Sequence, residues 1–154
     1  MSAHTDPIVK DAPPPRAALS IVNPLLRLVL RTPISRAIDA LAILEFTGRR
    51  TGDRRRVVVG WHIVDGTPTV LTPAAWRANF TEPRLAAVRW RGSESAQIGT
   101  LDSDPDVVAR AVNTLIEGGA SARSLALEMP TGHIVTAQDI VDTHRAIIRF
   151  EAAS

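Results

Sequence analysis

Several residue types that carry chemistry are missing or rare in this 154-residue chain. Cysteine is absent, which excludes disulfides, thiolate metal ligands and a cysteine nucleophile. Tyrosine is also absent, so no phenol can donate a proton. The four histidines are not paired at helical spacing, and a zinc site is therefore not expected. Long apolar runs are lacking too, because the longest stretch without a charge, Gly66 to Trp76, holds two prolines and is too short to span a membrane.

The N-terminal region lacks an apolar stretch of the kind that a secretory signal needs. Residues 1–16 are polar and rich in proline, so we expect a cytoplasmic protein with a flexible lead in which nothing packs. The remaining residues, 17–154, are predicted to form a single domain. Hydrophobic residues make up 45% of the chain and charged residues 22%, as in an ordinary globular protein with a buried core.

Positive charge is unevenly distributed. Lysine occurs once, so 17 of the 18 basic residues are arginine. The stretch from Arg27 to Arg56 holds eight arginines and three acids, a net charge of +5, whereas Thr100 to Ser154 holds four arginines and eight acids, a net charge of −4. Because GC-rich codons alone can favour arginine, the placement of these residues is more informative than their number.

The hydrophobic pattern predicts a helix, a run of strands, a second helix and a last strand. Residues 17–40 have a helical pattern with a break at Thr32-Pro33. Short apolar runs separated by turns predict strands over 43–47, 55–64, 68–72, 85–90, 95–101 and 146–150. A helix is predicted to begin at Pro105 after the cap Asp104 and to stop at Gly118. Residues 121–128 are predicted to form a short helix, and Thr136 to Asp139 resembles a cap before another short turn. Strands and helices do not alternate, so an antiparallel barrel with peripheral helices fits better than a parallel sheet.

One turn between two predicted strands concentrates basic residues. It reads Gly48-Arg49-Arg50-Thr51-Gly52, and Arg54, Arg55 and Arg56 follow it. The glycines allow a tight turn and close backbone approach, and the guanidinium groups match phosphate or carboxylate geometry. The turn is therefore a candidate anion site, with a solvated basic hairpin as the alternative.

A second segment, from Thr72 to Asn79, places small residues before Trp76 and Arg77. Its indole suits stacking on a planar ligand, but a tryptophan that plugs one end of the barrel is the favoured interpretation. Trp61 and Trp90 are predicted to lie in the core or at the barrel rim.

The other polar residues indicate no catalytic machinery. His62 is predicted to lie on the face opposite Trp61, and neither His133 nor His144 has an acid or nucleophile at a known spacing. The alternating aspartates at 102, 104 and 106 lack the rest of a calcium loop, and Asp104 is better explained as a helix cap. We therefore predict no catalytic side chain and no metal ligand.

The chain resembles the deazaflavin-dependent nitroreductase family of split β-barrel proteins. The likeness is carried by NPLLRLVLRTPISRAIDALAILEFTGRRTGDRRRVVVGWHIVDG, with Arg55 three residues after the second glycine and the small-aromatic pair Gly60-Trp61. The later segment WRANFTEPRLAAVRWRG is similar to the family's Trp-x-x-Asn-Leu segment and the Pro-Arg turn after it. The resemblance covers about residues 23–101.

The resemblance implies a fold, a cofactor and a reaction. The fold would be a mainly β (α+β) split β-barrel like that of flavin reductases and pyridoxamine phosphate oxidases, with an N-terminal helix and peripheral helices. The cofactor would be coenzyme F-420, a deazaflavin, with FMN as the alternative. The reaction would pass a hydride to a quinone, a nitroaromatic or another unsaturated acceptor. By position, the residues implied to hold the cofactor are Arg49, Arg50, Thr51, Gly52, Arg55, Leu71, Thr72, Ala74, Trp76 and Arg77.

The chain departs from the family pattern in three places. Val58 stands where the family usually has proline beside the ring, the loop before Trp76 is short, and the tyrosine that assists some nitroreductases is missing. A second hypothesis is therefore a non-catalytic protein that binds a cofactor or a lipid-like ligand. A third is peripheral membrane contact through residues 17–40. A nucleic-acid partner is not expected, and both a monomer and a homodimer stay open.

Overall fold

The computed structural model describes residues 8–11 and 40–154. The helix predicted over 17–40, with its Thr32-Pro33 break, lies outside these residues, as does most of the predicted lead. Within the lead, the Val9 side chain is only 1% exposed, and β1 (Lys10–Asp11) pairs with β8 (Leu127–Glu128). The prediction that nothing in residues 1–16 packs is therefore wrong around Val9, because a two-residue strand is too short to show a periodic pattern.

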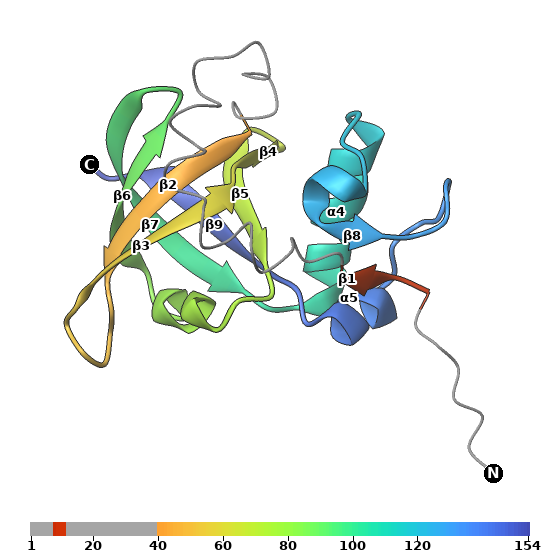
Figure 1. Cartoon of the computed structure of the whole chain (residues 1–154), viewed down its shortest axis with the longest axis horizontal. Coiled ribbons are helices and arrows are strands. Elements are labelled where there is room, and N and C mark those ends of the chain that lie inside the picture. The colour runs from red at the N-terminus through yellow and green to blue at the C-terminus, as the bar shows by residue number, and fades with distance from the viewer. Residues whose placement is uncertain (1–7, 12–39) are drawn as a thin grey trace, which may run out of the picture.

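One antiparallel sheet of seven strands forms the main body of the described chain. Its spatial order is β3-β2-β6-β7-β9-β5-β4. The strands are β2 (Leu41–Thr47), β3 (Arg54–Gly60), β4 (His62–Val64), β5 (Thr67–Thr72), β6 (Arg84–Trp90), β7 (Ser93–Asp102) and β9 (Ala146–Ala152). The sheet curls into a half-barrel, visible in Figure 1, and its edge strands β3 and β4 are consecutive in the sequence. The predicted mainly β split barrel with peripheral helices is confirmed.

The concave side of the sheet encloses an aromatic core. Alternate residues of β2 point inward and are buried, as in Leu44 and Phe46. Phe80 and Phe150 pack edge to face with ring centres 5.9 Å apart. At Gly99, an added Cβ would lie 2.7 Å from the Phe150 ring and 2.8 Å from the Phe80 ring, so only glycine lets both rings approach this strand.

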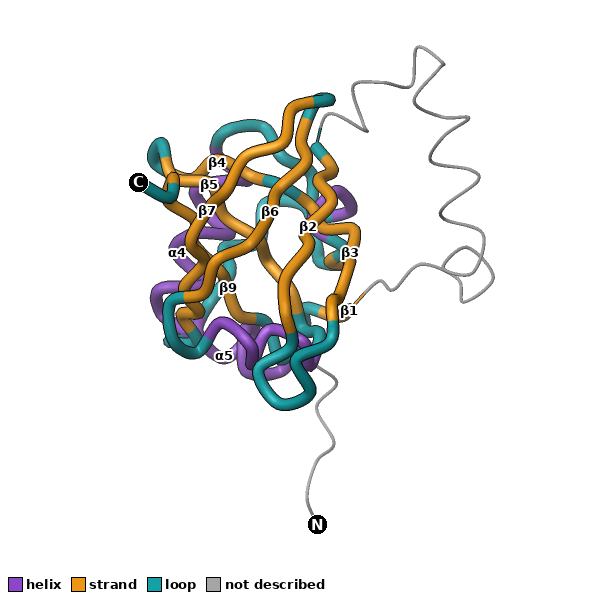
Figure 2. Tube along the Cα trace, turned by 90° about the vertical axis from the view of Figure 1, so that its left-hand side faces the viewer, coloured by secondary structure: helices purple, strands orange, loops and turns teal. Residues whose placement is uncertain are grey.

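A helical layer packs on the other side of the sheet and forms a second core. It contains α4 (Pro105–Glu117), α5 (Ala137–Thr143) and the short 3-10 helix η2 (Arg123–Leu125). Figure 1 shows α4 and α5 on the side of β4 and β5 and away from β6, and Figure 2 looks onto the strands from the opposite side. In β9, Ile147 faces the helices while Ile148 faces the barrel. None of the helices in residues 8–11 and 40–154 is long and apolar enough to cross a membrane.

The helix caps follow the sequence prediction closely. The Asp104 side chain accepts a hydrogen bond from the Asp106 N–H (2.9 Å), and Pro105 is the first helical residue of α4. A capping box joins Thr136 and Asp139 at the start of α5. The cap predicted at Asp104 is thus confirmed, whereas Asp102 accepts from the Asp104 N–H (3.0 Å) and pairs with Arg149 (3.2 Å).

Two local predictions need correction. The strand predicted over 55–64 breaks at Trp61, whose N–H donates to the Ala40 carbonyl (2.6 Å) and whose side chain is buried. The chain there passes from one edge of the sheet to the other, a turn in space that a continuous valine-rich run does not reveal. Residues 121–128, predicted as a short helix, contain only η2 before the chain enters β8.

Candidate functional site

The arginine turn, residues 48–53 between β2 and β3, is a tight and ordered turn. The Gly48 N–H donates to the Asp53 carbonyl (2.8 Å), and the Gly52 N–H donates to the Gly48 carbonyl (2.9 Å). The Thr51 hydroxyl accepts from the Asp53 N–H (3.2 Å), and Gly52 has a φ of +71°. Gly48 is buried, and a Cβ there would lie 3.1 Å from the Thr51 hydroxyl oxygen and 3.4 Å from Arg55 Nε.

Strand alternation divides the arginines around this turn into two sets. Glu45 lies on the outer face of the sheet and pairs with Arg54 Nε (3.4 Å) and with an Arg56 terminal nitrogen (3.1 Å). Arg55 lies between them and occupies the face of β3 that also carries buried Val59. Arg49, Arg50 and Arg55 have no carboxylate partner within residues 8–11 and 40–154. The unpartnered set therefore produces a local excess of positive charge.

The 3-10 helix η1 (Ala75–Phe80) closes the end of the barrel beside this turn. The half-buried Trp76 ring lies 5.8 Å from Phe46 and 6.1 Å from Phe80, measured between ring centres. The favoured prediction that Trp76 plugs one end of the barrel is confirmed. Trp61, only 4% exposed, belongs to the core as predicted, and Trp90 packs against it with ring centres 6.4 Å apart.

Two side chains that the sequence analysis missed connect the arginine turn to η1. Asn79 Oδ1 accepts from the Arg49 N–H (2.8 Å), while Asn79 Nδ2 donates to the Trp76 carbonyl (2.7 Å). Arg84 donates from Nε to the Asn79 carbonyl (2.8 Å) and from a terminal nitrogen to the Thr47 carbonyl (3.0 Å). Both residues lie in the segment that carries the family resemblance, which was the available signal. The two predicted site segments are thereby held side by side.

The residues predicted at the end of β5 are placed differently. Leu71 packs against the helical layer, whereas its neighbour Val70 faces the barrel core, so Leu71 lies on the opposite side of the sheet from the barrel interior. The buried Thr72 uses its hydroxyl to accept from the Ala74 N–H (3.0 Å). Arg77 donates to the Thr72 carbonyl (3.4 Å) and also to the His144 carbonyl at the junction of α5 and β9.

The structure therefore brings together only part of the predicted set. Arg49, Arg50, Thr51, Gly52 and Arg55 form one group, and the Asn79 bridge places it next to the helix that carries Trp76. Thr72, Ala74 and Arg77 form a second group of local hydrogen bonds around the start of η1. Leu71 joins neither group.

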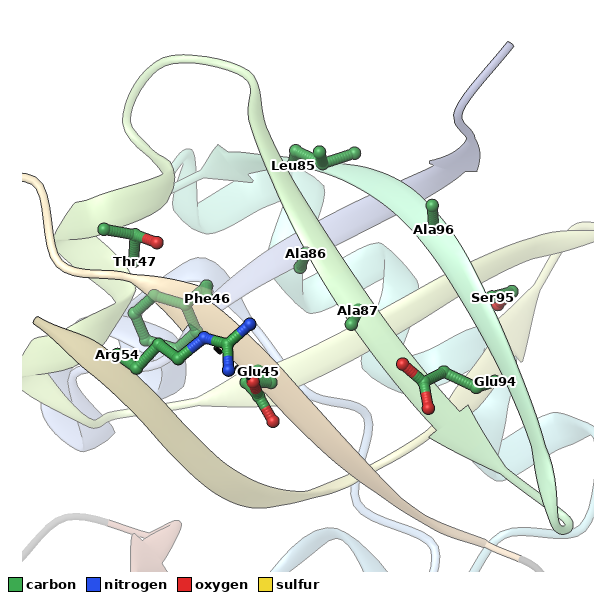
Figure 3. Close-up of a pocket in the computed structure, with 10 residues that line it drawn as sticks. All are labelled: Glu45, Phe46, Thr47, Arg54, Leu85, Ala86, Ala87, Glu94, Ser95 and Ala96. Carbon is green, nitrogen blue, oxygen red and sulfur yellow. Dashed lines mark ion pairs between the residues drawn. The ribbon is translucent and has the colours of Figure 1, made fainter.

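An open hollow of about 500 Å³ lies on the outer face of β2, β3, β6 and β7, shown in Figure 3. Its lining combines apolar Leu85 and Ala87 with the Arg54–Glu45 ion pair and with Glu94. None of the ten lining residues belongs to the predicted cofactor set. The hollow thus lies on the face of the sheet opposite to that of Arg55.

The histidines of the described chain take structural positions. His133 Nε2 lies 2.8 Å from Asp139 Oδ2. Sequence spacing did not indicate this partner, because the contact forms where the loop before α5 folds back onto the capping box. Burial raises the pKa of Asp139, but hydrogen bonds with His133 and Thr136 outweigh it and hold that pKa below its usual value. Burial lowers the pKa of His62. Nowhere in the described residues do three or more potential metal ligands gather.

Comparison with known proteins gives structural likenesses and no activity. No protein-family model matches the chain, and no curated protein does. Among solved structures, a conserved hypothetical protein from Mycobacterium tuberculosis, Rv2991, is similar with 13% identity and a TM-score of 0.47, over 80% of this chain and 81% of that one. The protein Atu2129 from Agrobacterium tumefaciens, of unknown function, is similar with 12% identity and a TM-score of 0.41, over 82% of this chain and 57% of that one.

Proposed function

We propose that this protein is an oxidoreductase that binds reduced coenzyme F-420 and delivers its hydride to a quinone, a nitroaromatic or another unsaturated acceptor. The observation that carries the proposal is the set Arg49, Arg50 and Arg55, which is ordered at the barrel end and lacks carboxylate partners within the described chain. A second support is the family resemblance of residues 23–101. This resemblance implies a split β-barrel, and the half-barrel of the structure agrees with it.

The chemistry of the side chains fits the anionic part of such a cofactor. A deazaflavin carries a phosphate and glutamates, and guanidinium groups bind both through paired, charge-assisted hydrogen bonds. The arginines would hold this anionic tail, with the Thr51 hydroxyl as an additional donor. The Arg55 side chain lies close to the turn, because its Nε is 3.4 Å from the place that a Cβ at Gly48 would take.

The protein's contribution would be position and electrostatics. The bound cofactor supplies the hydride chemistry itself. Trp76 lies in the helix clipped to the turn, where its indole can border the flat part of a ligand whose tail the arginines hold. An acid or base side chain is not required by this scheme, which agrees with the absence of tyrosine and cysteine.

Fluorescence titration with coenzyme F-420 tests the proposal. We expect saturable binding by the wild-type protein and about tenfold or greater loss of affinity in Arg50→Ala and in Arg55→Ala, the range of one charge-assisted hydrogen bond. Arg56→Ala is the matched control, because Arg56 is next to Arg55 in the sequence but its guanidinium is already paired with Glu45. It should change the affinity less than twofold.

Three results would redirect the proposal. Equal loss in all three variants would mean that charge alone matters and that the site assignment is wrong. A clear preference for FMN would keep the site and change the cofactor. Tight binding of reduced cofactor with no turnover on a panel of quinones, enones and nitroaromatics would favour a non-catalytic binding protein.

A further inference from the structure

We infer that Asn79 is a positioning residue for the anion site, one that fixes the arginine turn against the helix of Trp76. The identity of the ligand in this inference rests on the proposed function. The geometry rests on hydrogen bonds within this chain. The Asn79 amide bonds in two directions: its oxygen accepts from the Arg49 N–H in the turn (2.8 Å), and its nitrogen donates to the Trp76 carbonyl in η1 (2.7 Å). Thirty residues separate Arg49 from Asn79, so this is a long-range connection.

The position of the main chain at Arg49 determines where the arginine side chains of the turn lie. Arg49 and Arg50 are both part of this backbone, and the Arg55 side chain lies close to it at Gly48. A turn whose residues 49–53 are exposed, and which is held only by its own internal hydrogen bonds, can tilt relative to the barrel. The bond from Arg49 to Asn79 removes that freedom before a ligand arrives, which lowers the ordering cost of binding.

Arg84 supports the same arrangement through two further hydrogen bonds. Its guanidinium donates to the Asn79 carbonyl (2.8 Å) and to the carbonyl of Thr47, the last residue before the turn (3.0 Å). Asn79 and Arg84 together thus join the end of β2, the arginine turn and η1. The arginines and Trp76 are expected to act as one preformed surface, suited to a ligand that joins an anion to a flat ring.

Asn79→Ala tests the inference, with Thr81→Ala as its control. The Thr81 hydroxyl donates only to the Ala78 carbonyl (2.8 Å), so the control removes one hydrogen bond from the same helical region without affecting the turn. Two measurements are made on the full chain: amide exchange of Arg49 by NMR, and affinity for coenzyme F-420 and for pyrophosphate as a simple phosphate probe. Asn79→Ala should accelerate the exchange of the Arg49 amide and lower the affinity for each ligand about tenfold. Thr81→Ala should leave the exchange rate and the two affinities within about twofold of the wild type.

A further variant separates positioning from folding. Asn79→Asp keeps an oxygen acceptor for the Arg49 N–H, so slow exchange at Arg49 should be restored even if Asn79→Ala folds poorly. Rapid exchange in Asn79→Asp, or wild-type affinity in a folded Asn79→Ala, overturns the inference. If the wild-type protein binds pyrophosphate but not coenzyme F-420, the proposed function fails while Asn79 is still judged on pyrophosphate. Binding of neither ligand overturns both.

Discussion

In the helical layer the Asp139 carboxylate bonds to His133 and to the Thr136 N–H, whereas at the arginine turn three guanidinium groups meet no carboxylate within the described residues. Both regions are ordered by a side chain that reaches a distant backbone group: Asn113 bonds twice to Val135 (2.9 Å each), as Asn79 bonds to Arg49. The difference lies in what is left over. The buried Asp139 carboxylate is used within the fold, while the turn presents its charges outward.

This difference separates stability from binding. A buried charged group with its hydrogen bonds satisfied contributes to the folded state, and losing one partner leaves the other unpaired. Exposed arginines without partners contribute little to folding and are available to a ligand. The two regions should therefore respond oppositely to mutation.

The largest effect is expected from Asp139→Ala in the helical layer. It removes the N3 side chain of the capping box and leaves His133 without its partner, which should lower the free energy of unfolding by about 2 kcal/mol. Urea unfolding followed by circular dichroism measures this change. Asp142→Ala on the same helix, whose exposed carboxylate bonds only to Gln138, should change stability by less than about 0.5 kcal/mol.

The binding side of this comparison is equally testable. Ligand affinity should be unchanged in folded Asp139→Ala, in contrast to Arg50→Ala, which should lose affinity and keep its stability. A loss of both properties in either variant would show that the two regions are coupled rather than separate.

An intermediate effect is expected from pH. The pKa of Asp139 in the folded protein lies below its ordinary value of 3.8, so folding favours the carboxylate. Its stabilisation is full above that ordinary value and is lost as the pH falls through the lower folded pKa. Asp139→Asn should therefore show a shallower fall in unfolding free energy below about pH 4 than the wild type. Identical slopes for wild type, Asp139→Asn and the control Asp142→Asn would contradict this assignment.

The sequence predicted the local features of these two regions but not their long-range hydrogen bonds. Caps and tight turns depend on a few adjacent residues, so Asp104, Thr136 and the arginine turn were found where expected. The strands followed from short apolar runs. What could not be predicted were the bonds of Asn79 and Arg84, because a polar side chain shows no periodicity that indicates its distant partner.

Two other differences between the sequence analysis and the structure have the same origin in three-dimensional placement. Leu71 was assigned to the cofactor from its position in a resemblance, but alternation along β5 directs it to the helical layer. The break at Trp61 follows from the closure of the sheet, which brings the start of β4 to the edge opposite β3. Both depend on which face of a strand is covered, and that is decided by the whole fold.

The smallest effect is expected from Glu45→Gln, which tests the division between the two arginine sets. Glu45 pairs with exposed Arg54 and Arg56, so its loss should cost less than about 1 kcal/mol of stability. Without this carboxylate both arginines add to the positive field at the turn, and affinity for coenzyme F-420 should rise about twofold at low salt. The gain should disappear near 1 M salt, where screening acts within about 3 Å. A tenfold loss of affinity would instead place Glu45 in the binding site, and the outer face of the sheet with its hollow would then replace the arginine turn as the ligand's location.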